Sequence, residues 1–172
     1  MNPDTITLRP LCEDDSITHI TQLLHRAYAN LAAMGLRYHA TWQDDDVTRS
    51  RLEGVASIIA ETDGVIVGTV TLYSCDDAES PCDWYRKSGV YTFGQFGVEP
   101  QLQRSGIGRR MMERIEHMAT AMGAEELACD TAMPAEHLIR WYTAMGYRPV
   151  DEVQWDITNY RSIVLSKRLR ME

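Results

Sequence analysis

The sequence predicts a single-domain α/β protein built on a mixed sheet. Short β-branched segments are interleaved along the chain with segments whose apolar residues recur at helical spacing. The 172 residues, 44% of them hydrophobic and 24% charged, are enough for one domain with a substantial core. We therefore expect one domain that covers residues 1–172.

The first half of the chain predicts a strand, two helices and a β-hairpin: residues 5–11, 17–35, 44–54, and 56–61 followed by 65–73. Asp14, Asp15 and Ser16 offer N-cap oxygens to the first helix, and the acidic residues 44–46 suit the positive end of the second. Asp63-Gly64 is the kind of dipeptide that makes a tight hairpin turn. Residues 74–87 are polar and are expected to form a loop.

The second half predicts three strands and two helices in alternation, followed by one further strand: residues 90–98, 107–122, 127–130, 134–145, 153–157 and 162–169. Gly94 and Gly97 lie inside the first of these strands, which indicates a bulge or a ligand close to the backbone. Pro134 suits the first turn of the last helix, and Gly123 and Gly146 are expected just beyond the ends of the two helices.

Glycines meet a helix start at residues 103–109, a segment that we call the phosphate cradle. Gly106 and Gly108 lack a Cβ, so their amides can approach an anion closely. The unpaired N–H groups and the dipole of a helix N-terminus favour phosphate. Arg104, Arg109 and Arg110 add positive charge, which a helix N-terminus disfavours unless an anion is bound there. A glycine-rich helix entry with solvated arginines is the alternative interpretation.

Two familiar nucleotide motifs do not fit the cradle. Met111 occupies the place of the third glycine of G-x-G-x-x-G, and no acidic residue follows at the ribose position, so a nicotinamide-dependent oxidoreductase is a distant alternative. The sequence contains no G-x-x-x-x-G-K-[ST] motif, which excludes a P-loop.

The composition of the chain limits the kinds of partner that we expect. The net charge of −8 argues against nucleic acid, because phosphate binding requires a basic face. No apolar stretch is long enough to cross a membrane, the chain start lacks the pattern of a signal peptide, and the four cysteines lack metal-ligand spacing. The five histidines form no metal-binding cluster either, so no metal is expected. We expect a cytoplasmic protein with reduced thiols, and a homodimer stays open as its assembly.

The cradle motif Gln103-x-x-Gly106-x-Gly108, with the strand before it and residues 141–147, resembles the GNAT superfamily of N-acetyltransferases over nearly the whole chain. The resemblance implies a mostly antiparallel sheet, flanked by helices and splayed between two central parallel strands. It implies acetyl-CoA as co-substrate, with the backbone of Phe96 and Val98 on the pantetheine arm. The pyrophosphate would be bound by the main chain of the cradle: Gln103, Arg104, Ser105, Gly106, Ile107, Gly108 and Arg109.

The resemblance also implies the chemistry, which is direct attack of a primary amine on the thioester. Tyr142 matches the tyrosine that lies near the sulfur of CoA in many relatives, so it is the candidate general acid. Its helical spacing with Leu138 and Met145 alone would suit a core tyrosine equally well. The general base is left open between Glu99, which we expect on the cradle side, Asp130, His39 and a chain of waters.

The acceptor is expected to be a small molecule or a peptide with a primary amine. In the superfamily it contacts the first two helices and the last strands, where this chain carries several aromatic residues: Tyr28, Tyr38, His39, Trp42, Trp155 and Tyr160. A non-catalytic acyl-CoA-binding or regulatory module on the same fold is the main alternative function.

Overall fold

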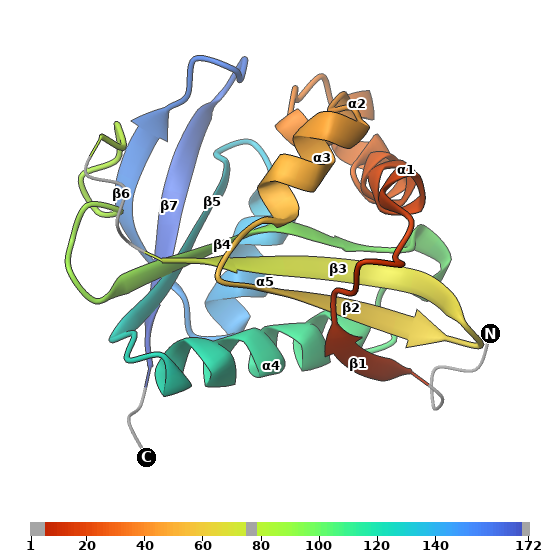
Figure 1. Cartoon of the computed structure of the whole chain (residues 1–172). Helices are drawn as coiled ribbons and strands as arrows, with labels where there is room; N and C mark the ends of the chain where they lie inside the picture. Colours follow the sequence, from red (N-terminus) through yellow and green to blue (C-terminus); the bar gives the residue numbers. More distant parts are fainter. Residues whose placement is uncertain (1–5, 75–78, 170–172) are drawn as a thin grey trace.

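The computed structural model describes residues 6–74 and 79–169 (Figure 1). Seven strands are found in these parts of the chain: β1 (Thr7–Pro10), β2 (Ala56–Thr62), β3 (Val65–Tyr73), β4 (Val90–Val98), β5 (Glu126–Ala132), β6 (Arg148–Gln154) and β7 (Arg161–Arg168). The described helices are α1 (Ile17–Ala27), α2 (Ala29–Ala33), α3 (Asp45–Leu52), α4 (Ile107–Ala121) and α5 (Glu136–Ala144), with short 3-10 turns η2 (His39–Thr41) and η3 (Pro100–Leu102). No helix in these residues is both long and apolar enough to span a membrane.

All seven strands join one sheet in the order β1-β2-β3-β4-β5-β7-β6. Every neighbouring pair is antiparallel except β4 and β5, which are parallel. This pair is hydrogen-bonded only from Val90 to Thr92 on β4 and from Glu126 to Ala128 on β5. Both strands continue for several residues beyond that point, so the sheet opens between them. The expected mixed, mostly antiparallel sheet with splayed central parallel strands is therefore confirmed.

Helices cover the two faces of the sheet (Figure 1). A Cβ built at Gly97 of β4 would lie 3.1 Å from Leu24 and 3.2 Å from Ala27, which places α1 on one face. A Cβ built at Gly68 of β3 would lie 3.0 Å from the sulfur of Met111, which places α4 on the other. Each face therefore has its own apolar layer, and the smaller layer lies under α1.

The caps and turns of the first half follow the sequence prediction. Ser16 accepts a hydrogen bond from the His19 amide, and Asp44 accepts one from the Val47 amide, so each begins its helix as expected. Asp63 and Gly64 have φ values of 50° and 73°, the left-handed pair that a two-residue hairpin turn requires.

Several element boundaries differ from the sequence prediction. The first helix is interrupted at Tyr28, which is both the C-cap of α1 and the N-cap of α2, while its extension α2 ends just before Gly35 as expected. The second helix ends at Leu52 rather than Gly54, and Pro134 precedes the N-cap of α5 instead of lying in its first turn. Strand β6 occupies 148–154 rather than 153–157, because its partner in β7 determines its length.

Strand β4 contains the expected bulge. Thr69 faces Gly97 and Thr71 faces Gly94, so two residues of β4, Gln95 and Phe96, lie opposite the single residue between the two threonines. Gln95 takes a left-handed φ of 48° although it is not a glycine. The bulge directs Gln95 toward the face of α1 and α3, where it meets Gln43, and Phe96 toward α4 and α5.

We expect that Gly97→Val will separate α1 from the sheet. Its new Cβ would lie within 3.4 Å of Leu24, Ala27 and Leu23, and overpacking of this kind costs about 1–3 kcal/mol. Gly94→Val on the same strand is the control, because the atoms near its Cβ all belong to the single ring of Tyr73. Urea unfolding should show a clearly larger loss for the Gly97 variant. Equal losses would mean that contact with α1 does not decide the need for glycine.

Candidate active site

The phosphate cradle forms an open helix N-terminus. Gly106 is the N-cap of α4 with a φ of 89°, and no side chain caps the helix. A Cβ built at Gly106 would meet nothing within 4 Å, so the space in front of its amide is free. The Ser105 hydroxyl turns away from the helix start and donates to the Leu102 carbonyl at 2.6 Å. The first amides of α4 are thus exposed at the positive end of the helix, as an anion site requires.

Arginines surround this helix start. The first turn of α4 contains no acidic residue, and Arg104 and Arg109 are exposed beside it. Arg104 has a left-handed φ of 63°, so the cradle reaches the helix through two unusual backbone conformations, Arg104 and Gly106. Arg110 is held away by the Ile6 carbonyl, which accepts from its guanidinium at 3.0 Å. Cations at this end oppose the helix dipole, and a bound phosphate would offset that cost.

An aromatic wall connects the cradle with the gap in the sheet. The rings of Phe96 and Trp141 stack with centroids 5.8 Å apart, and Trp141 meets Tyr142 edge to face at 5.0 Å. A Cβ at Gly108 would lie 3.5 Å from Phe96 and 3.6 Å from Trp141, so the first turn of α4 packs directly against this wall. Phe96, Gly108 and Tyr142, which the sequence assigned to one site, are therefore neighbours in the structure.

The backbone of β4 is exposed to the gap at Val98. The Glu99 amide donates to the Val67 carbonyl of β3 at 2.8 Å, so the N–H and C=O of the preceding Val98 point away from β3. Gln103 Nε2 donates to the Val98 carbonyl at 3.2 Å, and the Tyr28 hydroxyl donates to the Phe96 carbonyl at 3.0 Å. Both carbonyls thus have protein partners, and the Val98 N–H remains directed into the gap.

Tyr142 is buried at the end of the aromatic wall, between Phe93 and Tyr147. Burial raises the pKa of its hydroxyl well above the usual value, so the phenol stays protonated at all physiological pH values. The thiol of Cys129 on β5 is next to it, and burial likewise raises the pKa of that thiol well above its usual value. Tyr142 can therefore donate a hydrogen bond or a proton, but it cannot serve as a base.

The structure separates the candidate bases. Glu99 lies on the α1 side and not on the cradle side, because Arg26 of α1 binds both of its carboxylate oxygens. This ion pair keeps Glu99 from acting as a free base. Asp130 on β5 accepts from the Tyr85 hydroxyl at 3.1 Å and from Trp155 Nε1 at 2.9 Å.

His39 is the other remaining candidate and lies in η2, with its ring 4.5 Å from that of Trp42. Burial, and after it the charge of Arg51, lowers its pKa below the usual value, so the imidazole is neutral at pH 7. A neutral imidazole has the protonation state that a general base needs.

Three of the six acceptor-side aromatics, Tyr28, Tyr38 and Tyr160, form a second group on the face of α1. The other three lie apart from it: His39 pairs with Trp42, and Trp155 lies beside Tyr85. Tyr38 contacts both Tyr28 and Tyr160, with ring centroids 5.3 and 4.8 Å apart. Tyr38 is fixed further by Thr131, whose hydroxyl lies 2.8 Å from the Tyr38 hydroxyl. Sequence reasoning missed Tyr85, which contacts Trp155 at 6.2 Å, because it belongs to a segment that was interpreted only as a loop.

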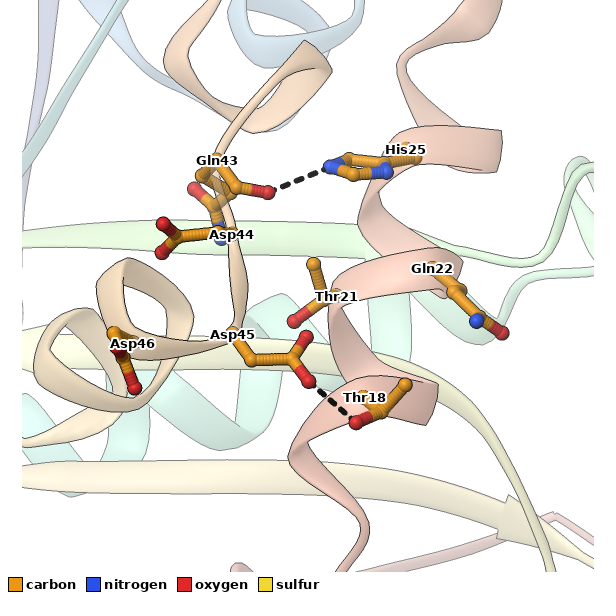
Figure 2. A pocket seen from close by; sticks show the side chains of 8 residues that line it. All are labelled: Thr18, Thr21, Gln22, His25, Gln43, Asp44, Asp45 and Asp46. Atoms are coloured by element: carbon orange, nitrogen blue, oxygen red, sulfur yellow. Dashed lines mark hydrogen bonds between the residues drawn. The ribbon is translucent and has the colours of Figure 1, made fainter.

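An open pocket of about 520 Å³ lies between α1 and the start of α3 (Figure 2). Three aspartates line it, and two of them have structural partners: Asp44 caps α3 and Asp45 accepts from Thr18. On its inner side His25 Nε2 lies 2.8 Å from the Gln43 carbonyl. The acidic side chains thus serve mainly to begin α3 and to attach it to α1.

Comparison of the chain with known proteins identifies its family. The acetyltransferase (GNAT) family profile matches residues 17–147. The chain is 26% identical over 133 residues to S-(2-succino)cysteine N-acetyltransferase of Bacillus subtilis, a match that spans 74% of this chain and 76% of that enzyme. It is 31% identical over 118 residues to an amino-acid acetyltransferase of Ralstonia nicotianae, which covers 64% of this chain and only 23% of that enzyme.

A solved structure shares the fold as well. A GNAT family acetyltransferase from Elizabethkingia anophelis with acetyl-CoA bound superposes with a TM-score of 0.68 at 17% identity, over 96% of this chain and 99% of that one. The chain therefore belongs to the GNAT family. It is an N-acetyltransferase, and enzymes of this family use acetyl-CoA.

We expect that Gly106→Val will weaken acetyl-CoA binding specifically. Gly123→Val is a matched control, since Gly123 follows the other end of α4, has a φ of 85°, and likewise has nothing within 4 Å of a built Cβ. Each variant should lose a similar stability, roughly 1–2 kcal/mol, because left-handed backbone is strained for a residue with a Cβ.

Calorimetric titration with acetyl-CoA should then separate the two variants. Affinity should fall by about tenfold or more for the Gly106 variant only, because only its side chain would obstruct a phosphate. Unchanged affinity in a folded Gly106→Val protein would show that the segment is merely a helix entry.

Proposed function

We propose that this enzyme transfers the acetyl group of acetyl-CoA to the primary amine of a small molecule by direct attack on the thioester. The observation that carries the proposal is the position of Tyr142. Its ring contacts Trp141, which stacks on Phe96 of β4, so Tyr142 and the cradle border the same gap. The whole chain would act as one catalytic domain. A cytoplasmic location and the oligomeric state stay predictions.

The cradle and the gap suit the two ends of the cofactor. Residues 103–109 would bind the pyrophosphate through main-chain amides, with Arg104 and Arg109 supplying charge. The pantetheine arm would lie along the open edge of β4, where the Val98 N–H has no strand partner on the β5 side. Phe96 would contribute its ring to the wall more than its carbonyl to a hydrogen bond, because Tyr28 already occupies that carbonyl.

The chemistry assigned to Tyr142 is protonation of the leaving group. The neutral amine attacks the thioester carbon, a C–N bond forms, and the carbonyl oxygen carries the negative charge until the C–S bond breaks. The departing thiolate takes a hydrogen bond or proton from Tyr142, whose raised pKa keeps the phenol protonated and able to donate. The excess proton of the attacking amine leaves to a base or to water, and His39 and Asp130 remain the candidates for this step.

The acceptor is proposed to be small rather than a protein. The names of both curated relatives identify them as enzymes of amino acids or cysteine derivatives. Asp130 is hydrogen-bonded to Tyr85 and Trp155. Burial raises the pKa of Tyr28 and Tyr160, and the charge of Asp130 adds to this rise. One carboxylate thus lies near both groups of aromatics, which suits a compact ligand.

An acceptor screen tests the proposed function. Amino acids, S-(2-succino)cysteine, polyamines, aminoglycosides and peptides would be offered with acetyl-CoA, and free CoA thiol would be measured. We expect one class of small amine to accelerate thiol release well above the rate without acceptor. A response to peptides alone would contradict the small acceptor, and no response to any amine would contradict acetyl transfer to amines.

We expect Tyr142→Phe to lower kcat by about 10²–10⁴-fold, since the ring is kept and only the proton donor is lost. Tyr147→Phe is the control, because Tyr147 is buried in the same group and its hydroxyl donates to Glu116 at 3.1 Å. The control should lose roughly 1 kcal/mol of stability with little kinetic change. Steady-state kinetics with the acceptor found above and thermal melts check both. A kcat loss below about tenfold for Tyr142→Phe would assign thiolate departure to water.

A further inference from the structure

Arg51 of α3 extends to the bulge of β4 and ends between two glutamines. Its Nη1 donates to Gln43 Oε1 at 2.8 Å, and its Nε and Nη1 lie 3.0 and 2.9 Å from the Gln95 side-chain amide. Gln43 is 0% exposed and Gln95 is 3% exposed, so the guanidinium is held from the inside of the protein. Arg51 as a whole is only half-buried and keeps a path to solvent.

Among the described residues, this small group has more hydrogen-bond donors than acceptors, although the Thr48 hydroxyl accepts from Gln43 Nε2 at 2.7 Å. The Gln43 amide nitrogen also lies 2.9 Å from the Gln95 amide. In one orientation of the Gln95 side-chain amide, its oxygen faces Gln43 and its nitrogen faces the Arg51 donors. In the other orientation, the Gln95 nitrogen faces the Gln43 nitrogen instead. Turning Gln43 instead would direct its nitrogen at Arg51. Every orientation leaves two donors in contact, which an added acceptor would relieve.

Arg51 also has no counter-ion in the described part of the chain. Among residues 6–74 and 79–169, no carboxylate lies within 4.0 Å of its guanidinium. By contrast, Arg9 bridges Asp15 and Glu61, and Arg26 binds Glu99. Amides cannot neutralise the charge of a partly buried guanidinium, so the site favours an anion with several acceptor oxygens.

The position of Arg51 connects it with the acceptor and not with the cofactor phosphates. Gln95 immediately precedes Phe96, and its side chain is on the sheet face of α1 and α3, opposite to α4. Burial raises the pKa of Tyr28 and Tyr160, and the charge of Arg51 opposes this rise at both tyrosines. Arg51 is therefore close to the acceptor-side aromatics, one residue along β4 from the aromatic wall.

We propose that Arg51 binds a carboxylate of the acceptor, so that the substrate is an amino acid or a derivative that carries a free carboxylate beside its primary amine. The inference rests on the proposed acetyl transfer to a small amine. Besides burial, the negative charge of Asp130 raises the pKa of the same two tyrosines, Tyr28 and Tyr160. The site therefore presents a positive and a negative charge to a zwitterion. The planar guanidinium can bind a carboxylate through two parallel hydrogen bonds.

The test compares each L-amino acid of the acceptor screen, S-(2-succino)cysteine included, with its own carboxamide at saturating acetyl-CoA. The carboxamide has the less basic amine, so without recognition of the carboxylate it would react at least as fast. We expect the acids to have kcat/KM about tenfold or more above the amides. Arg51→Met should lower kcat/KM about 10–100-fold for the acids and leave the amides nearly unchanged. Arg51→Lys should recover part of the preference, because it keeps the charge and loses the fork.

Arg49→Met on the same helix is the control, since Arg49 is an exposed arginine in the same last turn of α3. It should leave both series unchanged, and all variants should keep their affinity for acetyl-CoA, which also shows that they are folded. Amides that equal the acids, or an Arg51→Met loss shared by both series or by acetyl-CoA binding, would overturn the role of Arg51 while transfer to amines stands. No thiol release with either series or with the other amines would overturn the proposed function itself.

Discussion

The early end of hydrogen bonding between β4 and β5 is the constraint on which the rest of the site depends. The two parallel strands pair over three residues each and then diverge, which leaves main-chain groups of β4 without a strand partner. Buried backbone groups need partners, and here side chains supply them from both faces. The Tyr28 hydroxyl donates to the Phe96 carbonyl from the α1 side, and the Gln103 side chain of the cradle donates to the Val98 carbonyl. The gap is thus kept open by specific contacts, which is the condition for placing a ligand inside a sheet.

The bulge at Gln95 gives the two faces of β4 different neighbours. One residue, Phe96, joins the cofactor-side wall with Trp141, while its neighbour Gln95 meets Gln43 and Arg51 on the opposite side. A regular strand would also alternate faces, but the extra residue and its left-handed φ shift the register between the two halves of β4. Gly97 then lets α1 pack directly on the strand after the bulge. The proposed cofactor side and the proposed acceptor side consequently meet within two residues of one strand.

The distribution of charge is local and opposes the total. The chain carries a net charge of −8, yet the cradle gathers Arg104 and Arg109, and Arg51 has no carboxylate partner among the described residues. Many acidic residues are consumed in structural roles, such as Glu99 with Arg26 and Asp44 at the start of α3. Overall charge therefore argues only about a nucleic-acid partner, which it disfavours, and gives no information about the sign of a small ligand.

The sequence by itself determined the features whose causes are local. The apolar periods predicted the order of strands and helices, Asp63-Gly64 the hairpin, and the glycines of residues 103–109 the helix start, because each depends on a few consecutive residues. The motif in its order along the chain also predicted one site for Phe96 and Tyr142, and the rings of both contact Trp141. Only the tertiary structure decided that Glu99 is bound by Arg26 of α1, 73 positions away. It likewise decided that Arg51 of α3 reaches Gln95 of β4. Such pairings depend on the packing of α1 and α3 against β4, and no local pattern of residues encodes contacts between segments so far apart in the sequence.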